Sequence, residues 1–289
     1  MSAEKTKKRS MAVEIWQRLT RNKMAMLGLA ILVILALGAI FADVIADYDT
    51  KVIAQNISER LQGPSAAHWF GTDEFGRDIF ARILHGSRVS LVVGLISVSV
   101  SLILGGSLGA FAGYYGGRVD MIIMRIMDIF LAVPSILLAI TIVAALGTNL
   151  VNVMLAIGIS GIPSFARIVR AAVLSVKDQE FVESARAIGT SNATIIFREI
   201  LPNCMAPIIV QATLSVASAI LSTASLSFIG LGVQPPAPEW GAMLSSGRNF
   251  LRDAMHLTLF PGLAIVVTIL ALNLLGDGLR DALDPRLKQ

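Results

Sequence analysis

The sequence predicts an all-α integral membrane protein with six transmembrane helices and both termini in the cytoplasm. Three observations lead to this prediction: an apolar composition, six apolar stretches of membrane-spanning length, and an uneven distribution of basic residues between the connecting segments. Of the 289 residues, 55% are hydrophobic and 15% are charged, and the mean hydropathy is +0.72. A soluble globular domain carries about 25% charged residues, so a lipid bilayer is the expected surrounding of this chain.

Each predicted span is an apolar run near the ~20 residues that a helix needs to cross the hydrocarbon core. The six runs cover residues 24–42, 89–113, 129–146, 151–169, 205–233 and 257–275. A basic leader precedes the first run, but this run is longer than the ~7–15 residues of a signal-peptide core, so an uncleaved first helix is expected. Pro134 and Pro163, inside the third and fourth runs, predict kinks.

The distribution of lysine and arginine predicts the orientation. Residues 1–23, 114–128, 167–203 and those after 277 hold 17 of the 24 basic residues, whereas residues 43–88, 147–152 and 234–256 hold 7. Cytoplasmic segments carry the basic excess, so both termini are predicted to be cytoplasmic. Trp69 and Trp240, in the outer segments, are expected at the level of the lipid headgroups.

The expected organisation follows from these spans. It comprises a cytoplasmic amino-terminal segment (1–23), a first transmembrane helix (24–46), an extracytoplasmic loop (47–88), a five-helix core (89–277) that includes a cytoplasmic loop (171–203), and a cytoplasmic tail (278–289).

Small residues recur within two of the predicted spans. Four glycines of the second span are expected to let a neighbouring backbone approach closely: Gly105, Gly106, Gly109 and Gly113. Five serines of the fifth span either pack in the same way or line a wet path: Ser215, Ser218, Ser222, Ser225 and Ser227. Ser218, Ser222 and Asn273 are the candidate residues of a substrate pathway.

The cysteine and the histidines do not indicate a metal site. The single cysteine, Cys204, cannot form an internal disulfide and is expected to be a small buried hydrophobe. His68, His85 and His256 are far apart in the sequence and lack the spacing of zinc ligands. No metal ligand is therefore predicted.

No residue pattern indicates catalysis, a bound cofactor or nucleic acid recognition. The sequence lacks the phosphate-binding pattern Gly-x-x-x-x-Gly-Lys-Ser/Thr, a nucleophile–base pair and a clustered basic face. The apolar runs contain almost no ionisable residue, and Arg125 and Asp128 are expected to pair with each other at the mouth of the third run. Uphill transport by such a chain would take its energy from a partner. A secondary carrier or channel, and a membrane-embedded enzyme, are the alternatives.

A polar insert separates the fourth and fifth spans on the predicted cytoplasmic side. Apolar residues at helical spacing predict a first helix in it: Phe181, Val182, Ala185 and Ile188. Glu183 and Arg186 are spaced to pair on this helix.

The insert is also expected to turn back on itself. Gly189 is placed to end the first helix in the left-handed conformation. Ser191 or Asn192 is expected to cap a second helix that runs to Ile200 and stops at Pro202. From spacing alone, the insert is either a docking surface for a partner or an amphipathic connector that lies on lipid headgroups.

One sequence pattern in this insert resembles the cytoplasmic loop of ATP-binding-cassette (ABC) importer permeases. The pattern consists of Glu183-Ser184-Ala185, Gly189 and Leu201-Pro202. The family loop reads Glu-Ala-Ala, three residues, Gly, nine residues, Ile, one residue, Leu-Pro. Ser184 replaces its middle alanine, and Glu199 stands in place of its isoleucine, next to Ile200.

Four further segments narrow the resemblance to the dipeptide, oligopeptide and nickel branch of these permeases. They are residues 68–78, 227–236, 239–241 and 273–285. Together with the cytoplasmic loop they extend over most of the chain, and they are similar to the shorter, C-type permease subunit of dipeptide systems.

The resemblance implies an architecture, partners and a cargo. It implies the type I ABC importer permease fold in a bacterial cytoplasmic (inner) membrane, a second (B-type) permease subunit, two ATPase subunits that bind ATP and magnesium, and an extracytoplasmic solute-binding protein. Loop residues implied to contact the ATPases are Phe181, Glu183, Ser184, Ala185, Gly189, Leu201 and Pro202. Dipeptides, longer peptides, nickel complexes, glutathione and opine-like compounds all remain open as cargo.

Overall fold

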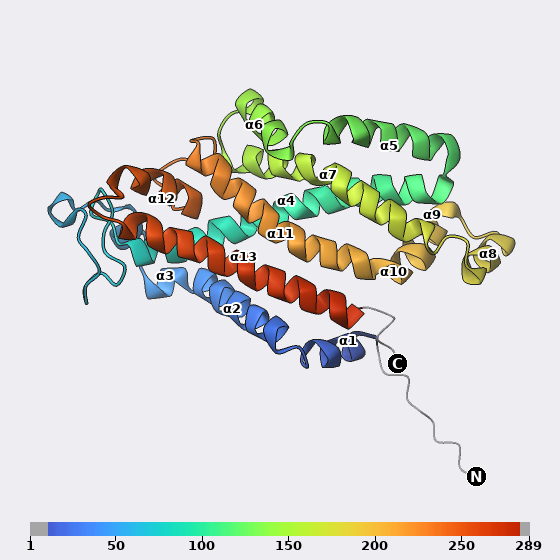
Figure 1. The fold of residues 1–289 in the computed structure, drawn as a ribbon, viewed down its shortest axis with the longest axis horizontal. Coiled ribbons are helices and arrows are strands. Elements are labelled where there is room, and N and C mark those ends of the chain that lie inside the picture. The colour runs from blue at the N-terminus through green and yellow to red at the C-terminus, as the bar shows by residue number, and fades with distance from the viewer. Residues whose placement is uncertain (1–10, 284–289) are drawn as a thin grey trace, which may run out of the picture.

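The computed structural model describes residues 11–283, and over that range its regular secondary structure is helical. Five helices are long and apolar enough to cross a membrane, and a bent pair makes a sixth if it forms one span. The five are α2 (Lys23–Ile40), α4 (Ile79–Tyr115), α7 (Leu150–Leu174), α11 (Met205–Phe228) and α13 (His256–Leu283). They run lengthwise through one elongated bundle (Figure 1). The predicted all-α membrane fold is confirmed.

Short elements gather at the two ends of this bundle (Figure 1). One end holds α3 (Ala42–Ile45), a π-helix (Tyr48–Ile53), a 3-10 helix (Ile57–Glu59), α12 (Trp240–Gly247) and a second 3-10 helix (Arg248–Phe250). The opposite end holds α1 (Met11–Leu19), the end of α13 and α8 (Glu180–Ala187). The first and last described helices thus lie at the same end of the bundle as the polar insert, in agreement with the prediction that places them on one side of the membrane.

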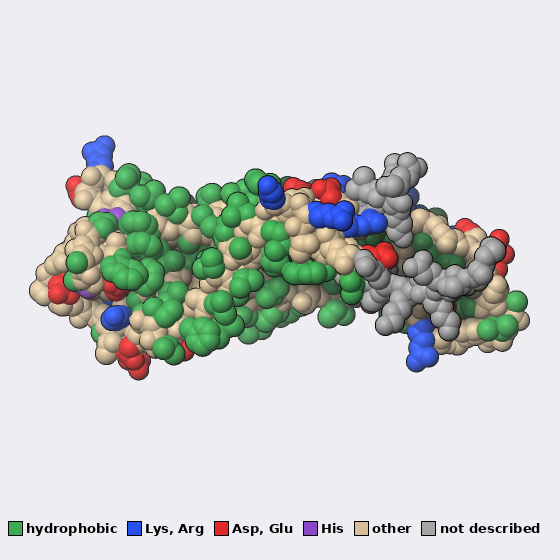
Figure 2. Space-filling view, turned by 90° about the horizontal axis from the view of Figure 1, so that it is seen from below, with side chains coloured by type: hydrophobic (Ala, Val, Ile, Leu, Met, Phe, Trp, Pro, Cys, Tyr) green, Lys and Arg blue, Asp and Glu red, His purple; other side chains and the backbone are tan. Residues whose placement is uncertain are grey.

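The surface shows the same division. On the face shown in Figure 2, hydrophobic side chains cover a broad zone between the left end and the centre of the molecule, and charged side chains lie at the left end and from the centre to the right end. Charged groups are costly in hydrocarbon, so a bilayer around the middle of the bundle matches this surface.

The third span is broken, whereas the sequence predicts one span over 129–146 with a kink at Pro134. α5 (Gly117–Leu131) and α6 (Ser135–Leu146) meet at an angle of 84°. Pro134 lies at the start of α6 with an extended ψ of 131°. Proline lacks the N–H of a helical turn and disfavours the helical conformation in the residue before it. The predicted kink at Pro134 is therefore a break, whereas Pro163 remains inside the continuous helix α7.

Glycines bring α4 and α7 into close contact, as predicted. A Cβ atom on Gly105 or Gly109 would overlap a backbone carbonyl oxygen of α7, that of Ile162 or Ala166. Gly106 differs, because a Cβ there would have no neighbour nearer than 3.7 Å. Small residues let helix backbones approach in this way, so three of the four predicted glycines are needed at this contact, the third being Gly113.

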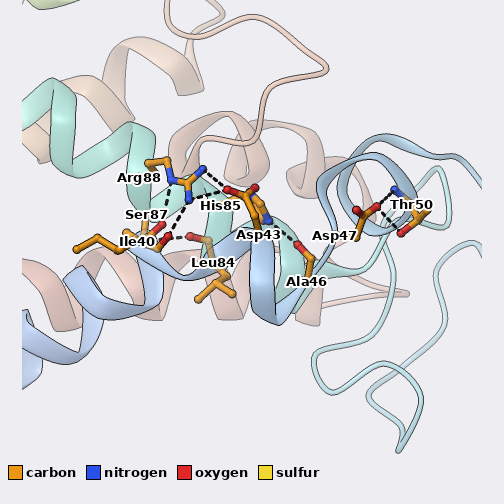
Figure 3. A network of polar contacts seen from close by, with 10 residues as sticks. Ile40, Asp43, Ala46, Asp47, Thr50, Leu84, His85, Ser87 and Arg88 are labelled. Carbon is orange, nitrogen blue, oxygen red and sulfur yellow. Dashed lines mark hydrogen bonds and ion pairs between the residues drawn. The ribbon is translucent and has the colours of Figure 1, made fainter.

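Arg88 ties the first span to the second at the outer end of the bundle (Figure 3). Its guanidinium donates to the carbonyl oxygens of Ala39 and Ile40 at 2.9 and 3.2 Å and pairs with Asp43 at 3.1 Å. The last carbonyls of a helix lack partners within the helix. Arg88 therefore caps the end of α2. Beside it, the buried His85 contacts the carbonyl oxygen of Ala46 at 2.7 Å.

The loop between α3 and α4 is held by a buried charge cluster. Asp73 accepts from the Arg77 side chain at 2.7 Å and lies 3.4 Å from the Arg82 Nε atom. Arg82 also donates to the carbonyl oxygen of Val52 at 2.9 Å. Asp73, Arg77 and Arg82 are each 6% exposed. Asp73 and Arg77 belong to the loop and Arg82 belongs to α4, so their buried contacts hold the loop against the start of α4.

Trp240 departs from its prediction, because it is buried in the protein and does not lie among lipid headgroups. Its side chain is 0% exposed, and its indole N–H donates to the carbonyl oxygen of Ile83 at 3.0 Å. Gly86 on α4 makes room for the indole ring. Trp69 is 65% exposed.

Candidate functional site

The segment between α7 and α11 folds back onto the bundle through its first helix. α8 buries Val182 and Ala185, which pack in one cluster with Tyr114, Val173 and Ile196. These partners come from the end of α4, the end of α7 and the second half of the segment. Residues 180–203, called the 180–203 loop below, are therefore attached to the helices they connect.

Gly189 ends α8 as predicted. Its φ is +80°, its N–H donates to the Arg186 carbonyl oxygen at 3.0 Å, and the Thr190 N–H donates to the Ala185 carbonyl oxygen at 3.1 Å. These two bonds form a Schellman motif, in which a left-handed residue closes a helix end. A Cβ atom at Gly189 would meet no atom within 4 Å, so conformation, not space, favours glycine here.

Ile188 is exposed, although its spacing predicts a place in the apolar stripe of α8. Its side chain is 83% exposed. The helix stops at Ala187, and Ile188 has the non-helical ψ of 5° that precedes the Gly189 turn. Because α8 ends one residue before Ile188, the helical spacing does not carry this side chain onto the buried face. The loop therefore exposes an apolar side chain.

The second half of the loop is helical, but Pro202 does not stop it. Ser191 caps α9 (Asn192–Thr194), a π-helix follows at Ile195–Ile200, and α10 covers Leu201–Asn203. The Leu201 N–H donates to the Ile196 carbonyl oxygen, five residues back. This wider turn leaves room for a proline, which has no N–H to donate.

The seven loop residues implied by the family resemblance separate into two groups. Glu183, Ser184, Gly189 and Pro202 are exposed, whereas Ala185 is buried and Phe181 and Leu201 pack partly buried against the loop cluster. Ile200 is 0% exposed and Glu199 is half-buried, so the isoleucine that follows the substituted position fills the core.

Tyr114 connects the loop to α4, and nothing in the local sequence pattern pointed to it. Its hydroxyl lies 2.8 Å from Asn192 Oδ1, and the Arg186 guanidinium lies over its ring at 5.1 Å from the centroid. The predicted Glu183–Arg186 ion pair is absent from residues 11–283. A cation over an aromatic face replaces it.

Two ion pairs attach α5 to α7 near the same end. Asp128 pairs with Arg167 at 2.7 Å, which corrects the predicted pairing with Arg125. Asp120 pairs with Arg170. Arg167 and Arg170 lie on α7 and reach across to α5. Asp128 therefore pairs with a residue of another helix and not with its near neighbour Arg125.

Cys204 is buried where the loop joins α11, as predicted. It is 5% exposed, and burial raises the pKa of its thiol. The thiolate is the reactive form, so little of it is present at neutral pH, and more forms only as the pH rises toward the raised pKa. We expect N-ethylmaleimide to label Cys204 far more slowly in the folded protein than in the detergent-denatured protein at pH 7. Equal rates would show that the thiol is accessible.

Ser218 and Ser222 line a groove among α4, α6, α7 and α11, with a volume of about 200 Å³. Its hydroxyl-bearing lining comes mainly from three helices: Ser135 of α6, Ser160 and Ser164 of α7, and Ser215, Ser218 and Ser222 of α11. Ser97 and Ser101 of α4 form its back wall. This hollow is called the serine groove below. Asn273, Ser225 and Ser227 are not among its lining residues.

The sequence that forms this bundle and loop matches two known protein families. Residues 105–289 match the family described as binding-protein-dependent transport system inner membrane component. The chain belongs to this family. Residues 10–64 of the permease also match the N-terminal transmembrane domain of oligopeptide transport permease C. The second match agrees with the branch that the sequence patterns resemble.

Curated relatives of the permease are bacterial transport permeases of similar length. It is 54% identical over 275 residues to a dipeptide transport system permease protein of Alkalihalophilus pseudofirmus, covering 95% of this chain and 90% of the relative. It is 50% identical over 279 residues to a glutathione transport system permease protein of Pectobacterium atrosepticum, covering 95% and 91%. A di/tripeptide transport permease of Pseudomonas aeruginosa is 48% identical over 279 residues, covering 95% and 92%.

Solved ABC transporters share the fold of the permease. A chain of the inward-facing MetNI methionine transporter superposes with a TM-score of 0.56 at 17% identity, covering 70% of the permease and 97% of that chain. A chain of an amino acid ABC transporter gives a TM-score of 0.55 at 15% identity, covering 71% and 95%. The predicted type I importer architecture is confirmed.

Proposed function

We propose that the permease forms half of the translocation pathway of an ATP-driven importer for peptides or similar small solutes. Its closely similar relatives are named for dipeptides, di/tripeptides and glutathione, which all contain amide bonds. The proposed partners are a second permease subunit, two ATPase subunits and an extracytoplasmic solute-binding protein. ATP and magnesium would act on the ATPase subunits, and no residue of this chain is assigned a catalytic role.

The 180–203 loop is the proposed coupling element. The observation that supports this most is an apolar side chain, Ile188, that is 83% exposed on a loop whose first helix packs against α4 and α7 through Val182 and Ala185. The same loop also exposes Phe197, at 53%, and apolar surface of this kind on a polar segment is what a protein partner would cover. The rigid attachment through Val182, Ala185 and Tyr114 lets a force on α8 act on the membrane helices. Movement of the ATPase pair would thus reach α7 and α11, which the loop joins directly.

Replacing Ile188 with aspartate tests this role. Ile188→Asp is expected to reduce co-purification of the ATPase subunits and ATP-dependent uptake about tenfold or more, because a central apolar contact is worth about 2 kcal/mol or more. The thermal stability of the permease is expected to change little, since the side chain is exposed.

Ile57→Asp is the matched control, because Ile57 is also exposed, at 58%, but lies at the opposite end of the bundle. This control is expected to retain the ATPase subunits. Gly189→Val is a second test, since a β-branched residue resists the left-handed conformation, and it is expected to lose uptake while the protein stays in the membrane. Full ATPase binding and uptake in both loop variants would exclude the coupling role.

A further inference from the structure

The serine groove offers hydrogen-bonding groups without charge. None of its lining residues is an Asp, Glu, Lys, Arg or His. Two of its serines have structural tasks: Ser97 and Ser101 are nearly fully buried and donate to the α7 carbonyl oxygens of Met154 and Gly158 at 3.0 and 2.6 Å. These bonds fix the back wall of the groove and are not available to a ligand.

Three other hydroxyls in the groove remain available. Ser135, Ser164 and Ser222 make no side-chain hydrogen bond to any residue between 11 and 283. They come from α6, α7 and α11, so they approach the same hollow from three different helices. Polar groups at membrane depth need partners, because lipid tails provide none. Ser135 and Ser164 are exposed and Ser222 is half-buried, so all three hydroxyls are open to hydrogen-bond a polar group that enters the hollow.

The groove continues toward the loop end of the bundle through Gln211. Gln211 lines both the serine groove and a second hollow of about 370 Å³, which Pro207, Leu214 and Arg280 also line. Its amide nitrogen donates to the Ser215 hydroxyl at 3.1 Å. Its carbonyl oxygen remains an acceptor at the junction of the two hollows. The polar lining thus extends along α11 toward the end where the permease carries its cytoplasmic loop.

We propose that the serine groove binds main-chain amide groups of the cargo during passage, through the hydroxyls of Ser135, Ser164 and Ser222. The proposal rests on the proposed function, in which the cargo is a peptide or peptide-like solute. A hydroxyl donates and accepts hydrogen bonds, so it matches both the N–H and the C=O of an amide. A charged cargo side chain finds no counter-charge in this groove. Recognition there therefore depends on the shared backbone and not on cargo side chains.

The first experiment measures uptake of radiolabelled alanylalanine by the complete transporter in liposomes supplied with ATP. The double variant Ser164→Ala/Ser222→Ala is expected to lower the uptake rate about 2- to 10-fold per hydroxyl removed, the factor that one neutral hydrogen bond is worth. Restoring the hydroxyl in Ser164→Thr/Ser222→Thr is expected to recover much of the rate. Co-purification of the ATPase subunits is expected to be unchanged.

Ser225→Ala is the matched control on the same helix. Ser225 is exposed, its hydroxyl donates to the Leu221 carbonyl oxygen at 2.8 Å, and it does not line the groove. Its replacement is expected to leave uptake unchanged. Wild-type rates in the double variant, or an equal loss in the Ser225 variant, would overturn the groove proposal.

The second experiment tests occupancy directly. In a Cys204→Ala background, Ser222→Cys is expected to react with a water-soluble cationic methanethiosulfonate, and saturating alanylalanine is expected to slow the reaction. Leu221→Cys, its exposed neighbour on α11, is expected to react slowly and without protection. An unreactive Ser222→Cys would mean that another helix or lipid fills the groove, which overturns the proposal. If the unmodified transporter takes up no alanylalanine with ATP, the proposed function itself fails.

Discussion

Gly109→Ala is expected to destabilise the permease by about 1–3 kcal/mol, the usual cost of adding atoms to a packed contact. A Cβ atom at Gly109 would overlap the carbonyl oxygen of Ala166 on α7. The overlapped atom belongs to the backbone, so no rotamer change relieves it, and α4 and α7 must move apart. The neighbouring bonds from Ser101 to α7 would lengthen as well. The measurement is the thermal unfolding midpoint of the purified protein in detergent.

Gly106→Ala provides the control one turn away on the same helix. Its Cβ would lie no nearer than 3.7 Å to the side chains of Leu102 and Val169, an ordinary van der Waals contact. Alanine is also the better helix former, by about 1 kcal/mol. Gly106→Ala is therefore expected to be neutral or slightly stabilising. Equal effects of the two substitutions would contradict the close contact of α4 with α7 at Gly109.

Asp73→Ala is expected to have the larger effect on the outer loop. Asp73 is the shared partner of Arg77 and Arg82, and all three are 6% exposed. Removing one member of a buried ion pair leaves an uncompensated charge and costs about 3–5 kcal/mol. Asp73 also accepts from the backbone N–H groups of Phe75 and Arg77 at 2.9 and 3.0 Å. The loop is therefore expected to open, and trypsin to cleave it faster at the exposed Arg60.

Asp49→Ala is the comparison within the same loop. Asp49 is exposed, and its side chain makes no ion pair with any residue in the described range 11–283. Its removal is expected to change stability by no more than about 0.5 kcal/mol. An Asp73 variant that resists trypsin as well as the Asp49 variant would show that the buried cluster does not hold the loop.

The loop motif shows where sequence reasoning succeeds. The left-handed Gly189 and the Ser191 cap were both predictable, because each depends on the conformational preference of one residue and on bonds to its near neighbours. Ile188 was not, because helical periodicity assumes that the helix continues past Ala187. The partners of Arg186 and Asp128 were also missed. Local spacing favours i,i+3 pairs, whereas the folded chain offers Tyr114 and Arg167 from other helices.

The residues predicted to line a substrate pathway show the same limit of local sequence patterns. The polarity of Ser218 and Ser222 within an apolar span makes them candidates for a pathway, and both line the groove. Asn273 was selected for the same reason and lies elsewhere. No sequence pattern predicts a role for Ser135 or Ser164, since α6 holds one serine and α7 holds two, too few for a recurring pattern. Their convergence with Ser222 depends on how α6, α7 and α11 cross.

By itself, the sequence determined that this chain is a helical membrane protein, where its apolar spans lie, and which loop carries the family pattern. Those properties follow from hydropathy and from preferences of neighbouring residues, which act over a few residues of chain. Only the tertiary structure decided that the third span breaks by 84° at Pro134, that Ile188 is exposed, and that serines of α6 and α7 share one groove with those of α11. The shared groove depends on how helices distant in sequence cross, and no local pattern encodes that crossing. The break and the exposed Ile188 have local causes, Pro134 and the end of α8 at Ala187, but neither the angle of the break nor the residue at which α8 stops follows from the sequence pattern.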